Sequence, residues 1–390
     1  MRILHTSDWH IGRTFHGVDL LADQTRVLRA IAELVTERGI DVVVVPGDVY
    51  DRSIPSSDAV AVCNAGFEAI REAGAVIVAT SGNHDSPVRL GAGAAFAAHG
   101  GLHLITRVSQ IDNPVVLDDE YGSVLFYGIP YLEPEITRAE LGVPGARSHQ
   151  EIVDAAMDRV RADAGRRGGR TVVLAHAFVV GAEPSESERS ISVGGVETVS
   201  ASSFDGADYV ALGHLHSPQT VAETVRYSGS PLPYSFGERT HRKAVFVVDL
   251  DASGVTAVDR VDLPVVRGLS RLEGTLDELL ADPAHAEAED HYVSAVLTDP
   301  IRPLDAMRRL QERFPFAVHV EWQRPAGSTE GSYRDKVRGR SDREIAAAFL
   351  TDVRSDPSAR ELGWIDEALR EVDRRRGVGE AAGTVRTDVA

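Results

Sequence analysis

The chain has 390 residues, of which 43% are hydrophobic and 26% are charged, values typical of a globular protein with two or three domains. It contains no run of about 18 apolar residues, which argues against a membrane-spanning helix. The opening MRILHTSDWH lacks the basic and apolar regions of a secretory signal, and Cys63 is the only cysteine. We therefore expect a cytoplasmic protein without an internal disulfide.

The net charge of −18 disfavours a protein that binds nucleic acid alone, because contacts to phosphate need lysine and arginine. Residues 331–390 hold twelve basic and twelve acidic side chains, so the acidic excess lies in the first 330 residues. Bound metal cations would neutralise part of that excess. The charge therefore still allows a subunit that reaches nucleic acid with the help of a partner.

Short apolar strands alternate with amphipathic helices over the first 265 residues. The predicted strands lie at residues 1–6, 40–46, 75–80, 123–129, 171–175, 209–212 and 244–250. Helices are predicted at residues 24–38 and 57–73, between the first three strands. This order predicts an α/β or α+β fold, a β-sandwich flanked by helices.

The pattern changes near Val266. A strand at 291–298, a helix at 304–314 and a strand at 317–322 predict a small separate α/β domain. Residues 327–343 are rich in Gly, Ser and Arg and are typical of a linker.

Two amphipathic helices are predicted after this linker, at residues 342–354 and 359–373. Ser341 and Glu344 have the spacing of a capping box at the start of the first helix. The apolar stripes consist of Ile345, Phe349 and Val353 in the first helix and Leu362, Ile365, Leu369 and Val372 in the second. Residues 377–390 are small and polar, and we expect them to be disordered.

Five short motifs with metal-ligand side chains follow predicted strands. They are Asp8-x-His10, Gly47-Asp48, Gly82-Asn83-His84-Asp85, His176 and Gly213-His214-Leu215-His216. Strand ends support side chains rigidly, which suits a preorganised metal site. Two Asp, one Asn and four His are too many ligands for one tetrahedral ion, but they suit two ions that share a carboxylate. The mixture of imidazole and oxygen donors favours Mn, Fe or Zn over Mg alone.

Most of these motifs also have a structural explanation when they are taken singly. A lone histidine such as His176 is often a satisfied structural residue, and Gly-Asp pairs are common in turns. The motifs GNHD and GHLH are more specific, because no turn requires those side chains together. The five motifs in this order therefore favour a metal centre over unrelated structural roles.

The order D-x-H, GD, GNHD, H and GHxH is similar to that of the calcineurin-like metallophosphoesterase superfamily. Within it, MRILHTSDWHIG, GDVYD, ALGHLH and YSGSP (Tyr227–Pro231) resemble the bacterial SbcD nuclease family. The resemblance spans the chain. It implies a nuclease domain over residues 1–265, a capping domain over 266–326, and a linker with an SbcC-binding helical segment over 327–390.

The resemblance also implies a role for each motif residue. One ion would be held by Asp8, His10 and His216 and the other by Asn83, His176 and His214, with Asp48 bridging the two. His84 is implied to be catalytic: it faces the scissile phosphate and is not a ligand. Asp85 is expected to orient His84 from behind or to cap a helix. Asp51 stands where archaeal relatives carry a histidine, so we leave it out of the ligand set.

The resemblance implies a DNA exonuclease and endonuclease that uses two divalent ions, Mn foremost, with Mg, Fe or Zn as alternatives. Its expected partner is an SbcC-type coiled-coil ATPase, with which it would act on double-strand ends and hairpins in recombination and repair. One alternative is another metallophosphoesterase, such as a cyclic-nucleotide phosphodiesterase or a protein phosphatase. The other is a non-catalytic scaffold for the ATPase, against which the intact ligand set argues.

Three further segments carry predictions about partners. Apolar residues on the helix at 57–73 and the run at 88–98 predict a homodimer through a four-helix bundle, within a heterotetramer; burial inside the monomer is the alternative. On the first helix these residues are Ala59, Val62, Cys63, Phe67 and Ile70. The loop at 182–204 either covers the site and touches DNA or is a plain connection. A basic cluster in the linker is predicted either to bind the DNA backbone or the ATPase, or to be a solvated linker. It consists of Arg334, Lys336, Arg338, Arg340 and Arg343.

Overall fold

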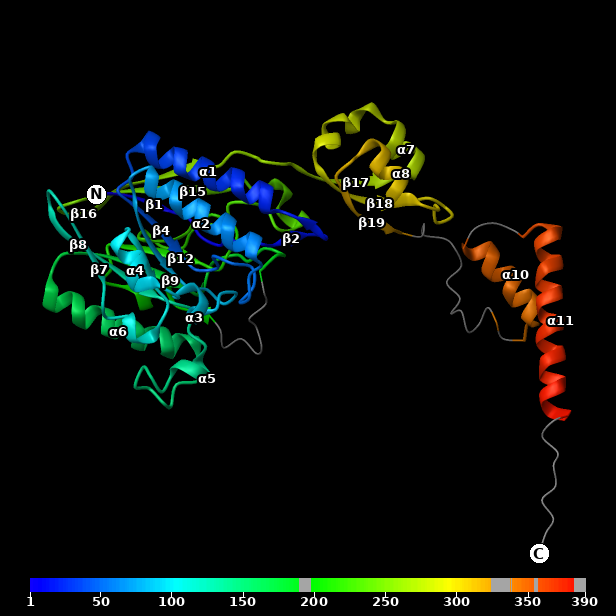
Figure 1. Ribbon diagram of the computed structural model, residues 1–390, viewed down its shortest axis with the longest axis horizontal. Coiled ribbons are helices and arrows are strands. Elements are labelled where there is room, and N and C mark those ends of the chain that lie inside the picture. Colours follow the sequence, from blue (N-terminus) through cyan, green and yellow to red (C-terminus); the bar gives the residue numbers. More distant parts are fainter. Residues whose placement is uncertain (189–197, 324–336, 338, 354–356, 382–390) are drawn as a thin grey trace, which may run out of the picture. The chain divides into compact units, whose positions relative to one another are not determined.

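The computed structural model describes residues 1–188, 198–323, 337, 339–353 and 357–381. The chain divides into two compact units, Met1–Gly268 and Leu269–Ala390 (Figure 1). No helix in these described ranges is long and apolar enough to cross a membrane.

The first unit is built on two six-stranded sheets. One has the spatial order β16 (Gly254–Asp262), β15 (Ala244–Asp251), β1 (Arg2–His5), β4 (Val42–Pro46), β5 (Val76–Thr80) and β6 (Leu102–Ile105). The other has the order β13 (Gln219–Thr220), β14 (Val225–Tyr227), β12 (Tyr209–Gly213), β9 (Arg170–His176), β8 (Gly122–Ile129) and β7 (Val115–Asp119). Strands β1, β4, β5 and β6 are parallel, as are β8, β9, β12 and β14.

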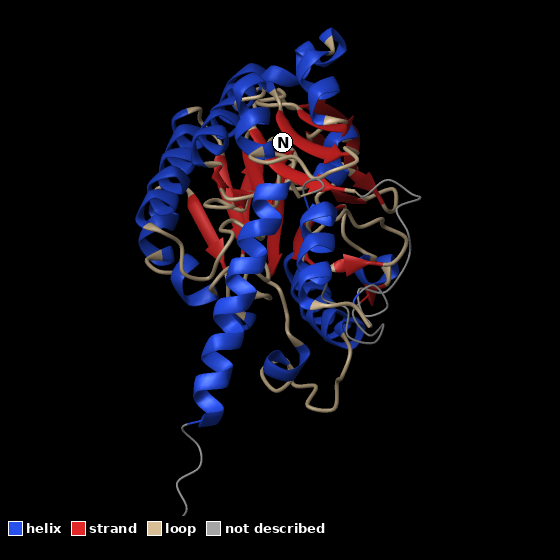
Figure 2. Ribbon diagram, turned by 90° about the vertical axis from the view of Figure 1, so that its right-hand side faces the viewer, coloured by secondary structure: helices blue, strands red, loops and turns tan. Residues whose placement is uncertain are grey.

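The alternation of side chains along the strands places the main core between the two sheets. Val42 and Val44 of β4 pack there with Phe126 of β8 and with Val172 and Leu174 of β9. The outer faces are covered by helices: α1 (Leu21–Arg38) and α2 (Ser57–Glu72) on one side and α6 (His149–Arg167) on the other (Figures 1 and 2). The predicted α/β sandwich flanked by helices is therefore confirmed.

Several short elements connect these layers. They are β2 (Thr14–Phe15), β3 (Val18–Asp19), α3 (Pro87–Leu90), α4 (Ala94–His99), α5 (Pro134–Thr137), β10 (Phe178–Val179), β11 (Thr198–Val199), and the 3₁₀ turns η1 (Val108–Gln110), η2 (Ala201–Phe204) and η3 (Phe236–Thr240).

Most apolar residues of the helix predicted to form a dimer pack within the monomer. Ala59, Cys63, Phe67 and Ile70 of α2 are buried, and α2 packs on α1. The run at 88–98 does not form one helix. It forms the short helices α3 and α4, because Gly93 between them takes a left-handed conformation at φ 74°. The homodimer stays a prediction. In the region predicted to form it, the largest exposed apolar side chain is that of Phe96, which is 85% exposed.

The second unit contains a parallel sheet with the order β17 (Leu269–Gly274), β18 (Tyr292–Leu297) and β19 (Ala317–Trp322). Helices α7 (Leu276–Ala281) and α8 (Ala306–Arg313) contribute to its core, and η4 (Pro283–Asp290) precedes β18. Leu272, Val293, Leu310 and Phe314 are buried there.

The C-terminal part of this unit has two helices that contact each other, α10 (Asp342–Val353) and α11 (Ala359–Ala381). The predicted capping box is present, because the Ser341 hydroxyl accepts from the Glu344 amide and the Glu344 carboxylate accepts from the Ser341 amide. The expectation of disorder from residue 377 is wrong as far as Ala381, since α11 continues to that residue. Residues 382–390 lie outside the described residues.

His5 links the two sheets of the sandwich. Its Nε2 lies 3.1 Å from the Leu212 carbonyl oxygen, and its Nδ1 lies 2.9 Å from the Tyr209 hydroxyl. Because a carbonyl only accepts, Nε2 must carry the proton and Nδ1 must accept from Tyr209. Burial lowers the pKa of His5 to about 3, so the ring is neutral in the folded protein near neutral pH.

Replacing His5 with Phe should destabilise the metal-free protein by about 1–3 kcal/mol at pH 7, because two buried polar groups lose their partner. Unfolded His5 takes up a proton near its ordinary pKa of 6.5, whereas folded His5 does so only near 3. The wild type therefore loses stability as the pH falls from 6.5 towards 3, and the variant escapes this one contribution. Urea unfolding between pH 7 and 4 should show the difference shrinking; a constant or growing difference would contradict this account.

Candidate metal centre

The five motifs meet at one edge of the sandwich. Asp8 and His10 follow β1, Asp48 follows β4, and Asn83 follows β5, three neighbouring parallel strands of one sheet. In the other sheet, His176 is the last residue of β9, and the GHLH motif begins at the last residue of the neighbouring β12. Parallel strands end at the same edge, so the fold brings these motifs together from both sheets.

The backbone at this edge is held in conformations that side chains rarely adopt. Asp8, His10, Asp48 and His214 have φ values of 52°, 44°, 49° and 109°. Each such residue costs about 1–3 kcal/mol and keeps this conformation only where the surrounding structure offsets that cost. Here the loops hold one another, because the Asp8 amide donates to the Gly47 carbonyl and the His10 amide donates to the Asp48 carbonyl. Strain concentrated on predicted ligands is typical of a functional site.

The glycines of the motifs leave room for their neighbours. A Cβ at Gly213 would lie 2.0 Å from the Pro46 carbonyl oxygen, and one at Gly47 would lie 2.4 Å from His176 Nδ1. A Cβ at Gly82 would lie 2.2 Å from Asp48 Oδ1. All three contacts are shorter than real Cβ atoms show, so only glycine lets these loops approach so closely. Gly213 and Gly47 do so between the two sheets and Gly82 within one sheet.

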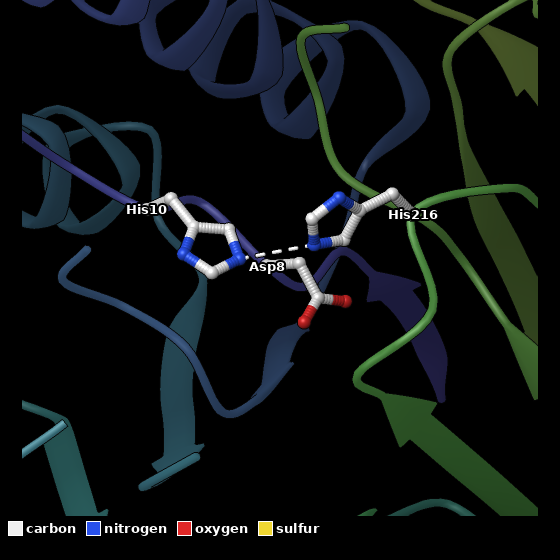
Figure 3. A group of neighbouring side chains, drawn as sticks. All are labelled: Asp8, His10 and His216. Atoms are coloured by element: carbon white, nitrogen blue, oxygen red, sulfur yellow. Dashed lines mark hydrogen bonds between the residues drawn. The ribbon is translucent and has the colours of Figure 1, made fainter. Parts of the chain in front are cut away.

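Asp8, His10 and His216 form one compact group, and all three are buried (Figure 3). The Nε2 atoms of the two histidines lie 3.0 Å apart. His10 Nδ1 has no hydrogen-bond partner among the described residues, and an Asp51 carboxylate oxygen lies 3.6 Å from it. The group therefore matches the ligand set predicted for the first ion.

Asp48 lies between this group and His176. Its Oδ2 is 3.6 Å from His10 Nε2 and 3.5 Å from His176 Nε2, while its Oδ1 accepts from the His84 amide at 2.9 Å. One carboxylate oxygen thus faces an imidazole of each predicted ligand set. This is the placement expected of a bridging carboxylate.

Residues predicted for the second ion also lie together. His176 Nδ1 donates to the Pro46 carbonyl at 2.9 Å, and its Nε2 lies 2.8 Å from Asn83 Oδ1. The ring of His214 is 5.3 Å from that of His176. Among the described residues, however, the clusters of Asp and His atoms that could hold an ion do not include His214. Its part in the second ligand set stays a prediction.

His84 and Asp85 differ in what they do. His84 Nδ1 donates to the backbone carbonyl of Asp51 at 2.8 Å. The carboxylate of Asp85 accepts backbone amides of Val49, Tyr50 and Gly82 at 2.9–3.1 Å. Asp85 therefore joins two loops of the site. The expectation that it orients the His84 ring is wrong, and so is the alternative of a helix cap, since Ser86 caps α3.

The charge distribution fits bound cations. Burial and the neighbouring Asp48 raise the pKa of Asp8 and raise that of Asp85 to about 7. Burial lowers the pKa of His10 and that of His216, so both rings are neutral and can offer a lone pair. Crowded carboxylates and neutral imidazoles with facing nitrogens are the chemistry of a divalent metal site. The residues present therefore fit the predicted group.

Sequence reasoning missed the residues that support these ligands. Gln24 Nε2 donates to the His10 carbonyl at 2.7 Å, and Ser7 Oγ donates to Asp8 Oδ2 at 2.6 Å. The YSGSP segment lies beneath the GHLH loop, where a Cβ at Gly229 would lie 2.6 Å from the His216 carbonyl oxygen. The first part of the 182–204 loop reaches the site through Ser187, whereas residues 189–197 lie outside the described residues.

Comparison with known families agrees with this geometry. The Calcineurin-like phosphoesterase family matches residues 1–218, more than half of the chain. The chain belongs to the calcineurin-like phosphoesterase family and is a metal-dependent phosphoesterase. A second family, described as Type 5 capsule protein repressor C-terminal domain and labelled SbcD_C, matches residues 265–354. This match supports an SbcD-like arrangement of the chain.

Solved structures give weaker similarities. The chain is 16% identical to the TT1561 protein of Thermus thermophilus, covering 68% of this chain and 99% of that one, with a TM-score of 0.41. A dimetal phosphatase from Danio rerio is 13% identical over 67% and 98% of the two chains, with a TM-score of 0.39. GAP50 of Plasmodium is 9% identical over 85% and 99%, with a TM-score of 0.38. These similarities are too weak to argue from.

Gly213→Ala should release bound metal and destabilise the protein by about 1–3 kcal/mol, because the new Cβ meets the Pro46 carbonyl oxygen and cannot be accommodated without moving β4 or β12. Gly165→Ala is the matched control, since a Cβ at that position of α6 meets nothing within 4 Å. Metal content by mass spectrometry and urea unfolding would be measured on both. Full metal occupancy in Gly213→Ala would refute the close-approach argument.

Proposed function

We propose that this phosphoesterase is the nuclease subunit of an SbcCD-type complex, cutting DNA with two divalent ions, preferably Mn. One observation carries the proposal: an intact buried Asp/His centre stands on the same chain as a match to the SbcD_C domain. The excess of acidic residues in the first 330 positions does not oppose it, because part of that charge surrounds the metal centre.

The residues of the centre have two proposed roles in phosphodiester hydrolysis, holding the metal ions and contacting the scissile phosphate. Two bound divalent ions supply water of lowered pKa and stabilise charge on the phosphoryl oxygens. Asp8, His10 and His216 would hold one ion, and Asn83 and His176, with His214, the other. Asp48 fixes the spacing of the two sets. The Asp51 carbonyl holds the His84 ring by Nδ1, which leaves Nε2 for the scissile phosphate or the leaving oxygen.

The C-terminal helices are proposed to bind the coiled-coil base of an SbcC-type ATPase. None of the side chains described in α10 and α11 is buried, and Phe349, Trp364 and Val372 are 50%, 56% and 43% exposed. Short helices are marginal alone, and apolar stripes of this kind bind in grooves of other proteins. The basic cluster before them includes Arg334, Lys336 and Arg338, which lie outside the described residues.

Two alternative functions fit the chain less well than a nuclease subunit. A cyclic-nucleotide phosphodiesterase or a protein phosphatase would use the same centre but has no need of the SbcD_C region. A non-catalytic scaffold would bury two carboxylates side by side without the cations that stabilise them. The homodimer within a heterotetramer remains part of the proposal, with Phe96 of α4 as its most exposed apolar residue.

His84→Ala should keep both ions and lose about 10²-fold or more of Mn-dependent cleavage of single-stranded DNA, because proton transfer to the leaving oxygen is lost. Asp48→Ala should lose both metal and activity. His99→Ala is the matched control, since His99 Nδ1 also bonds a backbone carbonyl, at 2.9 Å, but away from the site. Metal content and cleavage would be measured on one preparation; loss of metal from His84→Ala would make His84 a ligand.

Deleting residues 340–390 should leave metal binding and cleavage of short single strands unchanged and abolish both ATPase binding and ATP-dependent attack on duplex ends. The double substitution Phe349→Asp and Trp364→Asp tests the apolar stripes of the two helices. Ile136→Asp is the control, because Ile136 lies on the first unit and is 77% exposed. Co-purification with the SbcC-type ATPase is the readout. Full-strength binding by the truncated chain would show that the ATPase docks elsewhere.

A further inference from the structure

His216 is held at every polar atom except the one that faces the proposed ion. Its amide donates to Glu188 Oε1 at 2.7 Å, and its carbonyl accepts from Lys243 Nζ at 2.8 Å. Its Nδ1 lies 2.5 Å from the Ser187 hydroxyl. Only Nε2 remains, and it faces His10 Nε2 in Figure 3.

The Ser187 hydroxyl has one proton, and its neighbours decide where that proton goes. Glu238 Oε1 accepts from Ser187, from Ser235 Oγ at 3.1 Å and from the Tyr234 amide at 3.3 Å. A carboxylate only accepts, so Ser187 donates its proton to Glu238. The hydroxyl oxygen must then accept a proton from His216 Nδ1. With the proton on Nδ1, Nε2 carries the lone pair that a metal requires.

Glu238 is held in turn by a buried cation. Lys243 Nζ donates to Glu238 Oε2, to Ser230 Oγ at 3.0 Å and to the His216 carbonyl, which uses all three of its protons. Both side chains are buried. A buried ion pair adds little to stability compared with apolar residues of the same volume, so its position directly behind a ligand calls for another reason.

We propose that Ser187 is a positioning residue that fixes His216 as the Nδ1-protonated tautomer, and that the Glu238–Lys243 pair fixes the direction of the Ser187 hydroxyl. The proposal rests on the metal centre of the proposed function, but not on its DNA substrate. It also gives the start of the 182–204 loop a role. Arg13 Nη2 donates to the Ser187 carbonyl at 2.9 Å and so secures this segment against the site.

The test is the affinity of the full-length protein for Mn²⁺, measured by chelator competition with stoichiometry. Ser187→Ala should weaken the site that contains His216 by about 10–100-fold, the usual effect of removing the partner of a metal-bound histidine. The other site should keep its affinity. Ser187→Thr retains the hydroxyl and should restore tight binding. Ser270→Ala is the matched control, because Ser270 Oγ contacts His291 Nδ1 at 2.8 Å in the second unit.

Thermal unfolding of the metal-free variants separates positioning from folding. Metal-free Ser187→Ala should lose some stability, because buried Glu238 and His216 lose a partner, but it should remain folded at the temperature of the binding measurement. Unchanged Mn²⁺ affinity in Ser187→Ala overturns the proposal, as does an affinity loss in Ser187→Thr equal to that in Ser187→Ala. A wild type that binds two Mn²⁺ but cuts no DNA would remove the nuclease function while leaving the Ser187 result readable.

Discussion

The structure depends on bringing Asp8 and Asp48 together, buried, at one edge of a β-sandwich. Two carboxylates in such surroundings repel each other and lose hydration, and burial together with Asp48 raises the pKa of Asp8. Bound cations remove both costs. The strained backbone of the loops, the three glycines without room for a Cβ, and the neutral histidines all follow from presenting these carboxylates to the same small volume.

The two-sheet architecture makes that arrangement possible. Parallel strands from both sheets end at one edge, so ligands far apart in the sequence need only short loops to meet. The His176 imidazole receives support from the other sheet through the Pro46 carbonyl, and the Asp8 carboxylate accepts the His214 amide in return. The centre is therefore also a link between the sheets, as is His5 below it.

The sequence predicted the sandwich and the meeting of the five motifs, because buried parallel strands are continuous apolar runs and Asp and His mark their ends. It did not predict α6, whose apolar residues are sparse among Ala and Arg, although Ser148 and Glu151 form a capping box. The predicted role of Asp85 was wrong, because side chains of adjacent residues can point in different directions. The Asp85 carboxylate accepts backbone amides of Val49, Tyr50 and Gly82. The support from Asp51 comes through a backbone carbonyl, which every residue has. Ser187, Glu238 and Lys243 carry no motif. Ser187 and Lys243 contact His216, and Glu238 contacts Ser187 and Lys243, only in the folded chain.

The central claim is that two ions occupy one site and share Asp48. Anomalous diffraction from crystals of the full-length protein soaked in Mn²⁺ tests it most directly. The account predicts two peaks about 3.5–4 Å apart, one beside Asp8, His10 and His216 and the other beside Asn83 and His176, with the Asp48 carboxylate between them. A single peak, or peaks away from these residues, would contradict it.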